Sequence, residues 1–130
     1  MLHAALAAMV CFSSVCVNTE VVSKQPEMGR GLSGRSALAP GKGMLFKFED
    51  EDLHRFWMKD MKFNLDIIWM DKQGKVVFIA PDLQPCTPQA CPSYGPPQKD
   101  LYVLEVNASF CKTNGIKPGS KATYTPPGSV

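Results

Sequence analysis

Residues 65–80, LDIIWMDKQGKVVFIA, decide the fold class, because two almost continuous apolar runs flank a polar four-residue turn. The turn at residues 71–74 is a strong hairpin signal, since its closing glycine readily adopts the positive φ that tight turns need. Apolar runs of this kind are typical of strands covered on both faces, as in a sandwich or a barrel. The stretch therefore predicts a central β-hairpin in a mainly β protein.

Shorter strand candidates and two short helices surround this hairpin. The further predicted strands are 44–48, 55–59, 101–106 and 121–125. An N-terminal hairpin is expected over residues 10–22, and short helices are expected at 26–32 and at 108–114, the second behind the N-cap candidate Asn107. We therefore expect a mainly β, single-domain, sandwich-like or barrel-like fold with one or two short helices.

Length and charge exclude several classes of protein. The chain has 130 residues, of which 45% are apolar and 20% charged, which suits one domain with its own core. Its formal net charge is only +2, whereas a dedicated nucleic-acid-binding protein is usually strongly basic. We therefore predict no nucleic-acid partner. The apolar run at residues 4–12 is roughly half of what a membrane-spanning helix needs, so no transmembrane segment is predicted.

The chain divides into three predicted regions. Residues 1–9 are either an N-terminal extension or the remnant of an export signal, which normally carries a basic start before its apolar run. Residues 10–125 form the mainly β domain, and residues 126–130 form a tail. Within the domain, residues 81–97 contain six prolines. Proline cannot donate a ladder hydrogen bond, so this stretch is predicted to be a long loop, a kind that is usually functional or disordered.

The cysteines bear on the cellular compartment. Four of the five form two Cys-x4-Cys pairs, Cys11 with Cys16 and Cys86 with Cys91, and Cys111 is left over. Three interpretations stay open: two disulfides, a zinc site made by the four cysteines, or reduced and buried thiols. The disulfides are favoured, because the N-terminal hairpin would place Cys11 opposite Cys16. We therefore expect an exported protein, periplasmic or extracellular, with the cytoplasm as the alternative.

Several motifs occur in an order that is typical of one protein family. They are Phe56-Trp57-Met58-Lys59, then Leu65-Asp66-Ile67, then Tyr102-Val103-Leu104-Glu105. Over about residues 15–125 the chain resembles the uncharacterised bacterial and archaeal family called domain of unknown function 192. The resemblance implies a small sandwich or barrel domain that often follows an export signal. That family has no established activity, so the resemblance assigns no functional residue.

The Phe-Trp-Met-Lys block carries the first candidate site. Strand alternation places Trp57 and Lys59 on one face, and Phe56 and Met58 on the other. An exposed tryptophan beside a lysine can stack on a ring or a cation, which indicates a ligand surface. The alternative is that the proline-rich loop covers Trp57, with Tyr94 packed over it.

Two carboxylates inside apolar strands form the second candidate. Asp66 and Glu105 each interrupt an apolar run, and a buried carboxylate needs either a partner or a shifted pKa. Arg35 and Lys59 are the expected ion-pair partners. The carboxylates therefore predict a cleft with acid–base chemistry, a structural ion pair, or strand ends that point to water. A Ser or Cys hydrolase is disfavoured, because only His3 and His54 could act as its base.

These patterns predict a small exported binding or accessory domain of unknown ligand, with a groove near Trp57, Lys59 and Asp66 that the 81–97 loop borders. The ligand-binding candidates are Arg35, Trp57, Lys59, Asp66, Tyr94 and Glu105. One alternative is a carboxylate-dependent hydrolase or isomerase that uses Asp66 or Glu105. Another is a metal-binding domain built on Cys11, Cys16, Cys86 and Cys91. No cofactor is predicted. The sequence leaves open the partner, a small molecule or a protein, and the oligomeric state.

Overall fold

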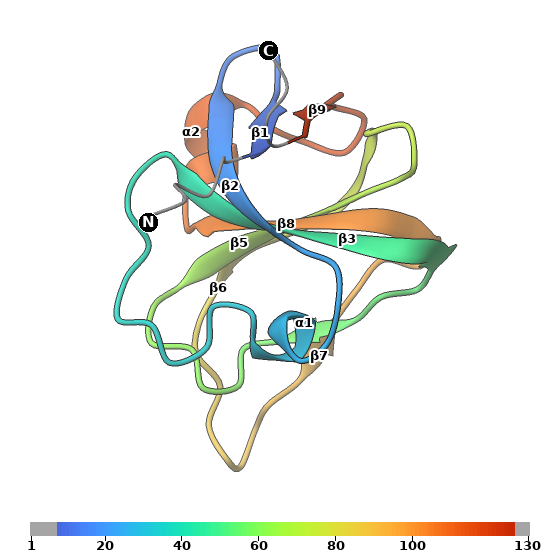
Figure 1. The fold of residues 1–130 in the computed structure, drawn as a ribbon. Helices are drawn as coiled ribbons and strands as arrows, with labels where there is room; N and C mark the ends of the chain where they lie inside the picture. The colour runs from blue at the N-terminus through green and yellow to red at the C-terminus, as the bar shows by residue number, and fades with distance from the viewer. Residues whose placement is uncertain (1–7, 127–130) are drawn as a thin grey trace, which may run out of the picture.

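The predicted hairpin lies at one edge of a strongly curled sheet, as a computed structural model of the chain shows for residues 8–126 (Figure 1). Within these residues, seven strands run in the order β6-β5-β8-β3-β2-β1-β9. Their bounds are β1 Ala8–Cys11, β2 Cys16–Val22, β3 Lys42–Asp52, β5 Leu65–Met70, β6 Val76–Leu83, β8 Asp100–Asn107 and β9 Thr123–Thr125. The predicted mainly β, barrel-like class is confirmed, since the sheet forms a half-barrel.

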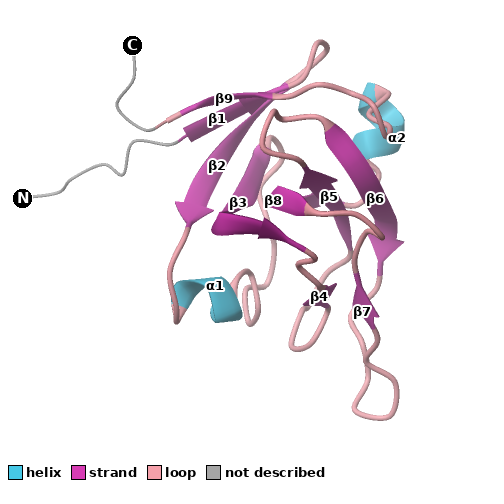
Figure 2. Ribbon diagram, turned by 90° about the vertical axis from the view of Figure 1, so that its right-hand side faces the viewer, coloured by secondary structure: helices cyan, strands magenta, loops and turns pink. Residues whose placement is uncertain are grey.

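Four smaller elements complete the fold. The short strands β4 (Phe56–Trp57) and β7 (Ser93–Tyr94) form a separate two-stranded sheet, and the helices are α1 (Glu27–Arg30) and α2 (Phe110–Asn114). The strands β2 and β3 pair in parallel, whereas all other neighbours in the large sheet are antiparallel. A parallel pair needs a long crossover, and the segment between β2 and β3 supplies it, carrying α1 below the sheet (Figure 2).

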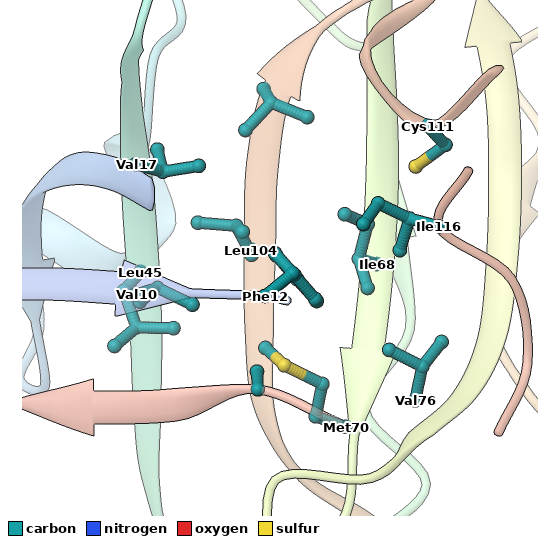
Figure 3. Close-up of a cluster of buried hydrophobic side chains, with 12 residues drawn as sticks. Val10, Phe12, Val17, Leu45, Ile68, Met70, Val76, Leu104, Cys111 and Ile116 are labelled. Carbon is teal, nitrogen blue, oxygen red and sulfur yellow. The ribbon is translucent and has the colours of Figure 1, made fainter. Parts of the chain in front are cut away.

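The sheet has an apolar cluster on each face, because successive strand residues point to opposite sides. One cluster, which we call the upper core, gathers Val10, Val17, Leu45, Ile68 and Leu104, with Cys111 and Ile116 covering Ile68 (Figure 3). The other, the lower core, contains Met44, Phe46, Ile67, Trp69 and Val103. The strands β3, β5 and β8 alternate between the two clusters. This alternation decides on which face each candidate site residue lies.

Several predicted boundaries differ from the structure. The acidic run at residues 49–52 does not end a strand, because β3 continues to Asp52. The strand β6 continues past Pro81 into the predicted loop. A proline is tolerated there because β6 is an edge strand of the sheet. Asn107 does not cap a helix. It belongs to β8 and its side-chain amide donates to the Leu38 carbonyl at 2.8 Å, while α2 starts only at Phe110.

The N-terminal hairpin begins earlier than predicted, since Ala8 and Met9 already belong to β1. Residues 1–7 and 127–130, which make up most of the predicted extension and tail, lie outside the described residues. Neither helix within residues 8–126 is long and apolar enough to cross a membrane.

Candidate functional site

A cavity of about 390 Å³ opens on the lower-core face, between the α1 segment and the strand β4. Its volume lies within the range of small-molecule sites, roughly 300–1,000 Å³. Its apolar walls include Met28, Leu32, Phe46, Phe48, Leu53, Phe56 and Met61. Its polar and charged lining residues include Arg30, His54, Arg55, Lys59 and Glu105. The cavity therefore combines an apolar interior with a few convergent polar groups.

Trp57 and Lys59 belong to this cavity, and their predicted orientation is confirmed. Trp57 is 53% exposed, while Met58 is buried and Phe56 packs edge-on against Phe46 with ring centroids 4.8 Å apart. The Lys59 ammonium lies 5.2 Å from the centre of the Trp57 ring. The alternative in which the loop covers Trp57 is therefore wrong. The exposed indole face and the lysine together offer a stacking surface for a ligand.

Glu105 lines the same cavity with its carboxyl group. The residue is 4% exposed, and no side-chain hydrogen bond or ion pair holds its carboxyl within residues 8–126. Burial raises its pKa from 4.5 to about 8, because no cation or donor offsets the lost hydration of the charged form. At neutral pH Glu105 is therefore a carboxylic acid, which can donate a hydrogen bond to a ligand.

His54 lines the cavity and contacts Asp100, which is fully buried and is not itself a lining residue. His54 Nδ1 lies 2.7 Å from Asp100 Oδ1, and the His54 backbone N–H donates to Asp100 Oδ2 at 3.2 Å. The imidazole stacks on Phe48 with ring centroids 3.6 Å apart, and the Trp69 indole N–H donates to the His54 carbonyl at 2.8 Å. The pKa of Asp100 is raised overall, because burial outweighs the hydrogen bonds with His54 that lower it. The Asp100 and Phe48 contacts thus fix the orientation of the His54 ring, and two further hydrogen bonds fix its backbone.

Sequence reasoning missed this pair. In the sequence, His54 is only one of two possible bases for a disfavoured hydrolase, and Asp100 stands 46 residues away in the chain. The two meet because β3 pairs with β8 up to the register Asp52 with Asp100. No local motif signals that register, so only the strand pairing could have revealed the dyad.

Asp66 does not lie in the predicted groove. The register pairs Asp66 with Val106 and Ile67 with Glu105, so the two carboxylates point to opposite faces of the sheet. Asp66 accepts backbone N–H groups from Asp82 at 2.8 Å, Ser109 at 3.3 Å and Cys111 at 2.9 Å. Its carboxylate therefore fixes the chain around the start of α2, and the groove prediction is wrong for this residue.

The predicted ion pairs of the two carboxylates are also wrong. Arg35 forms a bidentate pair with Glu20, at 2.6 and 3.1 Å, and both side chains are exposed. This pair lowers the pKa of Glu20 and raises that of Arg35. Tyr94 pairs with Phe56 across the β4–β7 sheet and lines a separate hollow beside the 81–97 loop. Of the six predicted site residues, the structure thus brings Trp57, Lys59 and Glu105 to one cavity.

The four paired cysteines form two disulfides, Cys11–Cys16 and Cys86–Cys91. The first closes the β1–β2 hairpin in the predicted register, and the second closes the 81–97 loop at the opposite end of the molecule (Figures 1 and 2). The zinc site built from these four cysteines is therefore wrong. Within residues 8–126 no group of three or more His, Cys, Asp or Glu side chains is placed to hold a metal.

Cys111 is the free cysteine of the described residues, and we expect it to resist modification. It is buried, and both burial and the neighbouring Asp66 carboxylate raise its pKa to about 12. The thiolate is the reactive form, so alkylation of the native protein should be negligible. Intact mass spectrometry should show no added label before unfolding and one after it, on a protein about four hydrogens lighter than the reduced chain. Labelling of two or more cysteines in the unreduced, unfolded protein would contradict the pairing.

Two solved structures are similar to this chain over most of its length. No curated protein matches it. A protein of unknown function from Novosphingobium aromaticivorans DSM 12444 has a crystal structure that is similar over 95% of this chain and 91% of its own, with 27% identity and a TM-score of 0.79. A Sinorhizobium meliloti 1021 protein described as a "putative transcription regulator" is similar over 95% and 96% of the two chains, with 25% identity and a TM-score of 0.80.

The family profile of DUF192, described as Uncharacterized ACR, matches residues 9–124. This match spans nearly the whole domain, from β1 to β9. It includes the strands that form the cavity as well as the disulfide-closed loop. The chain therefore belongs to the uncharacterised family DUF192.

Proposed function

We propose that this protein is a small binding domain whose cavity takes an organic anion with an apolar or aromatic body. The observation that carries the proposal is Trp57, a large aromatic side chain that stands 53% exposed at a cavity instead of packing in the core. Contact of a large apolar side chain with water is energetically unfavourable. Exposed aromatic faces are therefore typical of sites that contact a ligand. Apolar walls behind Trp57 would receive the ligand body.

The charges of the cavity support an anionic ligand. Three basic side chains line it, those of Arg30, Arg55 and Lys59. Glu105 is the one acidic residue among the lining residues, and its raised pKa of about 8 keeps it uncharged at neutral pH. Arg55 already donates from Nε to Ser93 Oγ and from a terminal nitrogen to the Ser93 carbonyl, both at 2.8 Å. Arg30 and Lys59 make no such side-chain bond within residues 8–126 and are free to pair with a carboxylate or a phosphate.

Export is part of the same proposal. The two disulfides are of a kind that persists in oxidising compartments and is rare in the cytosol. The disulfides also brace two segments that have few regular elements of their own, the β1–β2 turn and the 81–97 loop. We therefore place the protein in the periplasm or outside the cell. Nucleic acid is not among the proposed ligands, although one structural neighbour is described as a "putative transcription regulator".

The Trp57→Ala variant tests the proposal, with 3-phenylpropionate as the probe, a small anion with an aromatic ring. We expect saturable binding to the wild type in calorimetric titration and roughly tenfold weaker binding to the variant, since an aromatic pair contributes about 0.5–1.5 kcal/mol beyond its buried area. The free energy of unfolding should change little, because Trp57 packs against few core groups.

The Arg35→Ala variant is the matched control, because Arg35 is exposed and lies outside the cavity lining. It should bind 3-phenylpropionate like the wild type. Equal binding by Trp57→Ala and wild type would refute the assignment of Trp57, and the absence of any saturable binding would refute the proposed ligand class. A single-stranded oligonucleotide of mixed sequence, tested in the same titration, should show no binding at physiological salt.

A further inference from the structure

We infer that the cavity is also a proton-transfer site, in which His54 is the base, Glu105 is the acid and the substrate is a carbonyl compound with a hydrogen on the adjacent carbon. This inference rests on the proposed function, because it adds a reaction to the same bound organic anion. The evidence is the position of three groups: a fixed imidazole, its buried aspartate, and a buried carboxyl that makes no side-chain hydrogen bond or ion pair within residues 8–126. His54 and Glu105 line one cavity.

The contacts of His54 fit a general base. The His54 backbone N–H donates to one oxygen of Asp100, and the ring Nδ1 lies 2.7 Å from the other oxygen. We assign the ring proton to Nδ1. With Nδ1–H directed at Asp100, the lone pair of the ring lies on Nε2. Nε2 makes no hydrogen bond within residues 8–126, and His54 lines the cavity. Asp100 acts through His54 and is therefore a positioning residue.

Glu105 supplies the complementary acid. Its side chain is more than nine-tenths buried, makes no hydrogen bond or ion pair with residues 8–126 and reaches the cavity, so its acidic proton is available to a ligand oxygen. The raised pKa of about 8 keeps that proton in place at neutral pH. A group that can accept a proton and a group that can donate one, both facing one cavity, are what general acid–base chemistry requires.

The reaction conserves atoms and electrons without any cofactor. The His54 Nε2 lone pair takes the proton from the carbon next to the carbonyl, and the electrons of the broken C–H bond form a C=C double bond. The carbonyl π electrons move to oxygen, which takes the proton of Glu105, and an enol results. The reverse steps return a proton to carbon and one to Glu105. Return to the same carbon exchanges its hydrogen with solvent, and return to a conjugated carbon isomerises the substrate.

The charged groups around the cavity fit this chemistry. Arg30, Arg55 and Lys59 line it together with His54 and Glu105. A substrate carboxylate or phosphate near Arg30 or Lys59 would fix its orientation, with the apolar body against Trp57. The cations would also stabilise negative charge that develops on the carbonyl oxygen.

Phenylpyruvate in D2O is the test, because it is an aromatic anion with exchangeable hydrogens beside its ketone. We expect the wild type to accelerate deuterium incorporation at that carbon above the buffer rate, as followed by proton NMR with EDTA present to remove free metal ions. His54→Gln and Glu105→Leu should each reduce the protein-dependent rate by about 100-fold or more, the usual range for a general acid or base. Arg35→Ala should exchange at the wild-type rate.

Binding of 3-phenylpropionate to each variant separates the two proposals. Asp100→Asn should lower the exchange rate while it still binds the probe, since the amide keeps the contact but no longer fixes the tautomer. Exchange at the buffer rate by a wild type that binds 3-phenylpropionate would overturn the proton-transfer site and leave the binding function intact. A wild type that shows neither would overturn both. Wild-type exchange rates in folded His54→Gln, checked by circular dichroism, would overturn the role of His54.

Discussion

Asp66→Asn should destabilise the protein by about 2–4 kcal/mol, which is a large effect for an isosteric change. Asp66 is 1% exposed and lies on β5 facing the upper core. One of its oxygens accepts the backbone N–H groups of Asp82 and Ser109, and the other accepts that of Cys111. The amide of asparagine would place an N–H₂ donor against one of these donors and leave a buried N–H without an acceptor.

Thermal unfolding measures this effect directly. A loss of about 3 kcal/mol corresponds to a fall in Tm on the order of 10 °C for a domain of this size. The matched control is Glu20→Gln, which removes an exposed ion pair with Arg35 and should change stability by at most about 1 kcal/mol. Binding of 3-phenylpropionate to folded Asp66→Asn at low temperature should equal that of the wild type. An Asp66→Asn protein with an unchanged Tm and lost binding would contradict this structural role.

The two carboxylates, Asp66 and Glu105, show which features of the site can be predicted from the sequence. Asp66 and Glu105 look alike in the chain, because each interrupts an apolar strand. Both are buried in the structure. Their different roles depend on strand register, which pairs Glu105 with Ile67 and so turns the two side chains to opposite faces. A shift of one residue in this register would exchange the faces. Propensity and periodicity predict the strands but do not determine that register.

The fold class was easier to predict than the site. Local signals are sufficient for the β5–β6 hairpin and for the pairing of Cys11 with Cys16, because each lies within a few residues of its turn. The cavity depends on contacts between distant segments: the crossover that carries α1, the β4 strand, and Asp100 beside His54. The exposed Trp57 is the exception, since the alternation of the Phe-Trp-Met-Lys block already placed it outside the core.

Glu105→Gln should stabilise the protein at alkaline pH, in contrast to the Asp66 variant. Below pH 4.5 the Glu105 carboxyl is protonated in both the folded and the unfolded state, so it contributes no pH dependence. Between pH 4.5 and about 8 only the unfolded state ionises, and the folded state loses about 1.4 kcal/mol of stability per pH unit. Above pH 8 both states are ionised and the difference reaches its maximum, about 5 kcal/mol for this shift in pKa.

Urea unfolding of wild type and Glu105→Gln from pH 4 to pH 9 tests this prediction. The two proteins should have similar free energies of unfolding at pH 4, and the variant should become progressively more stable as the pH rises toward 8. Parallel curves would show that the carboxyl is solvated or paired in the folded state, and would remove the acid from the proposed reaction. Divergent curves would show that the folded protein holds an unpaired acid at a net cost in stability, next to an exposed tryptophan and a fixed histidine. Such a cost is typical of a functional site, where stability is given up for chemistry or binding.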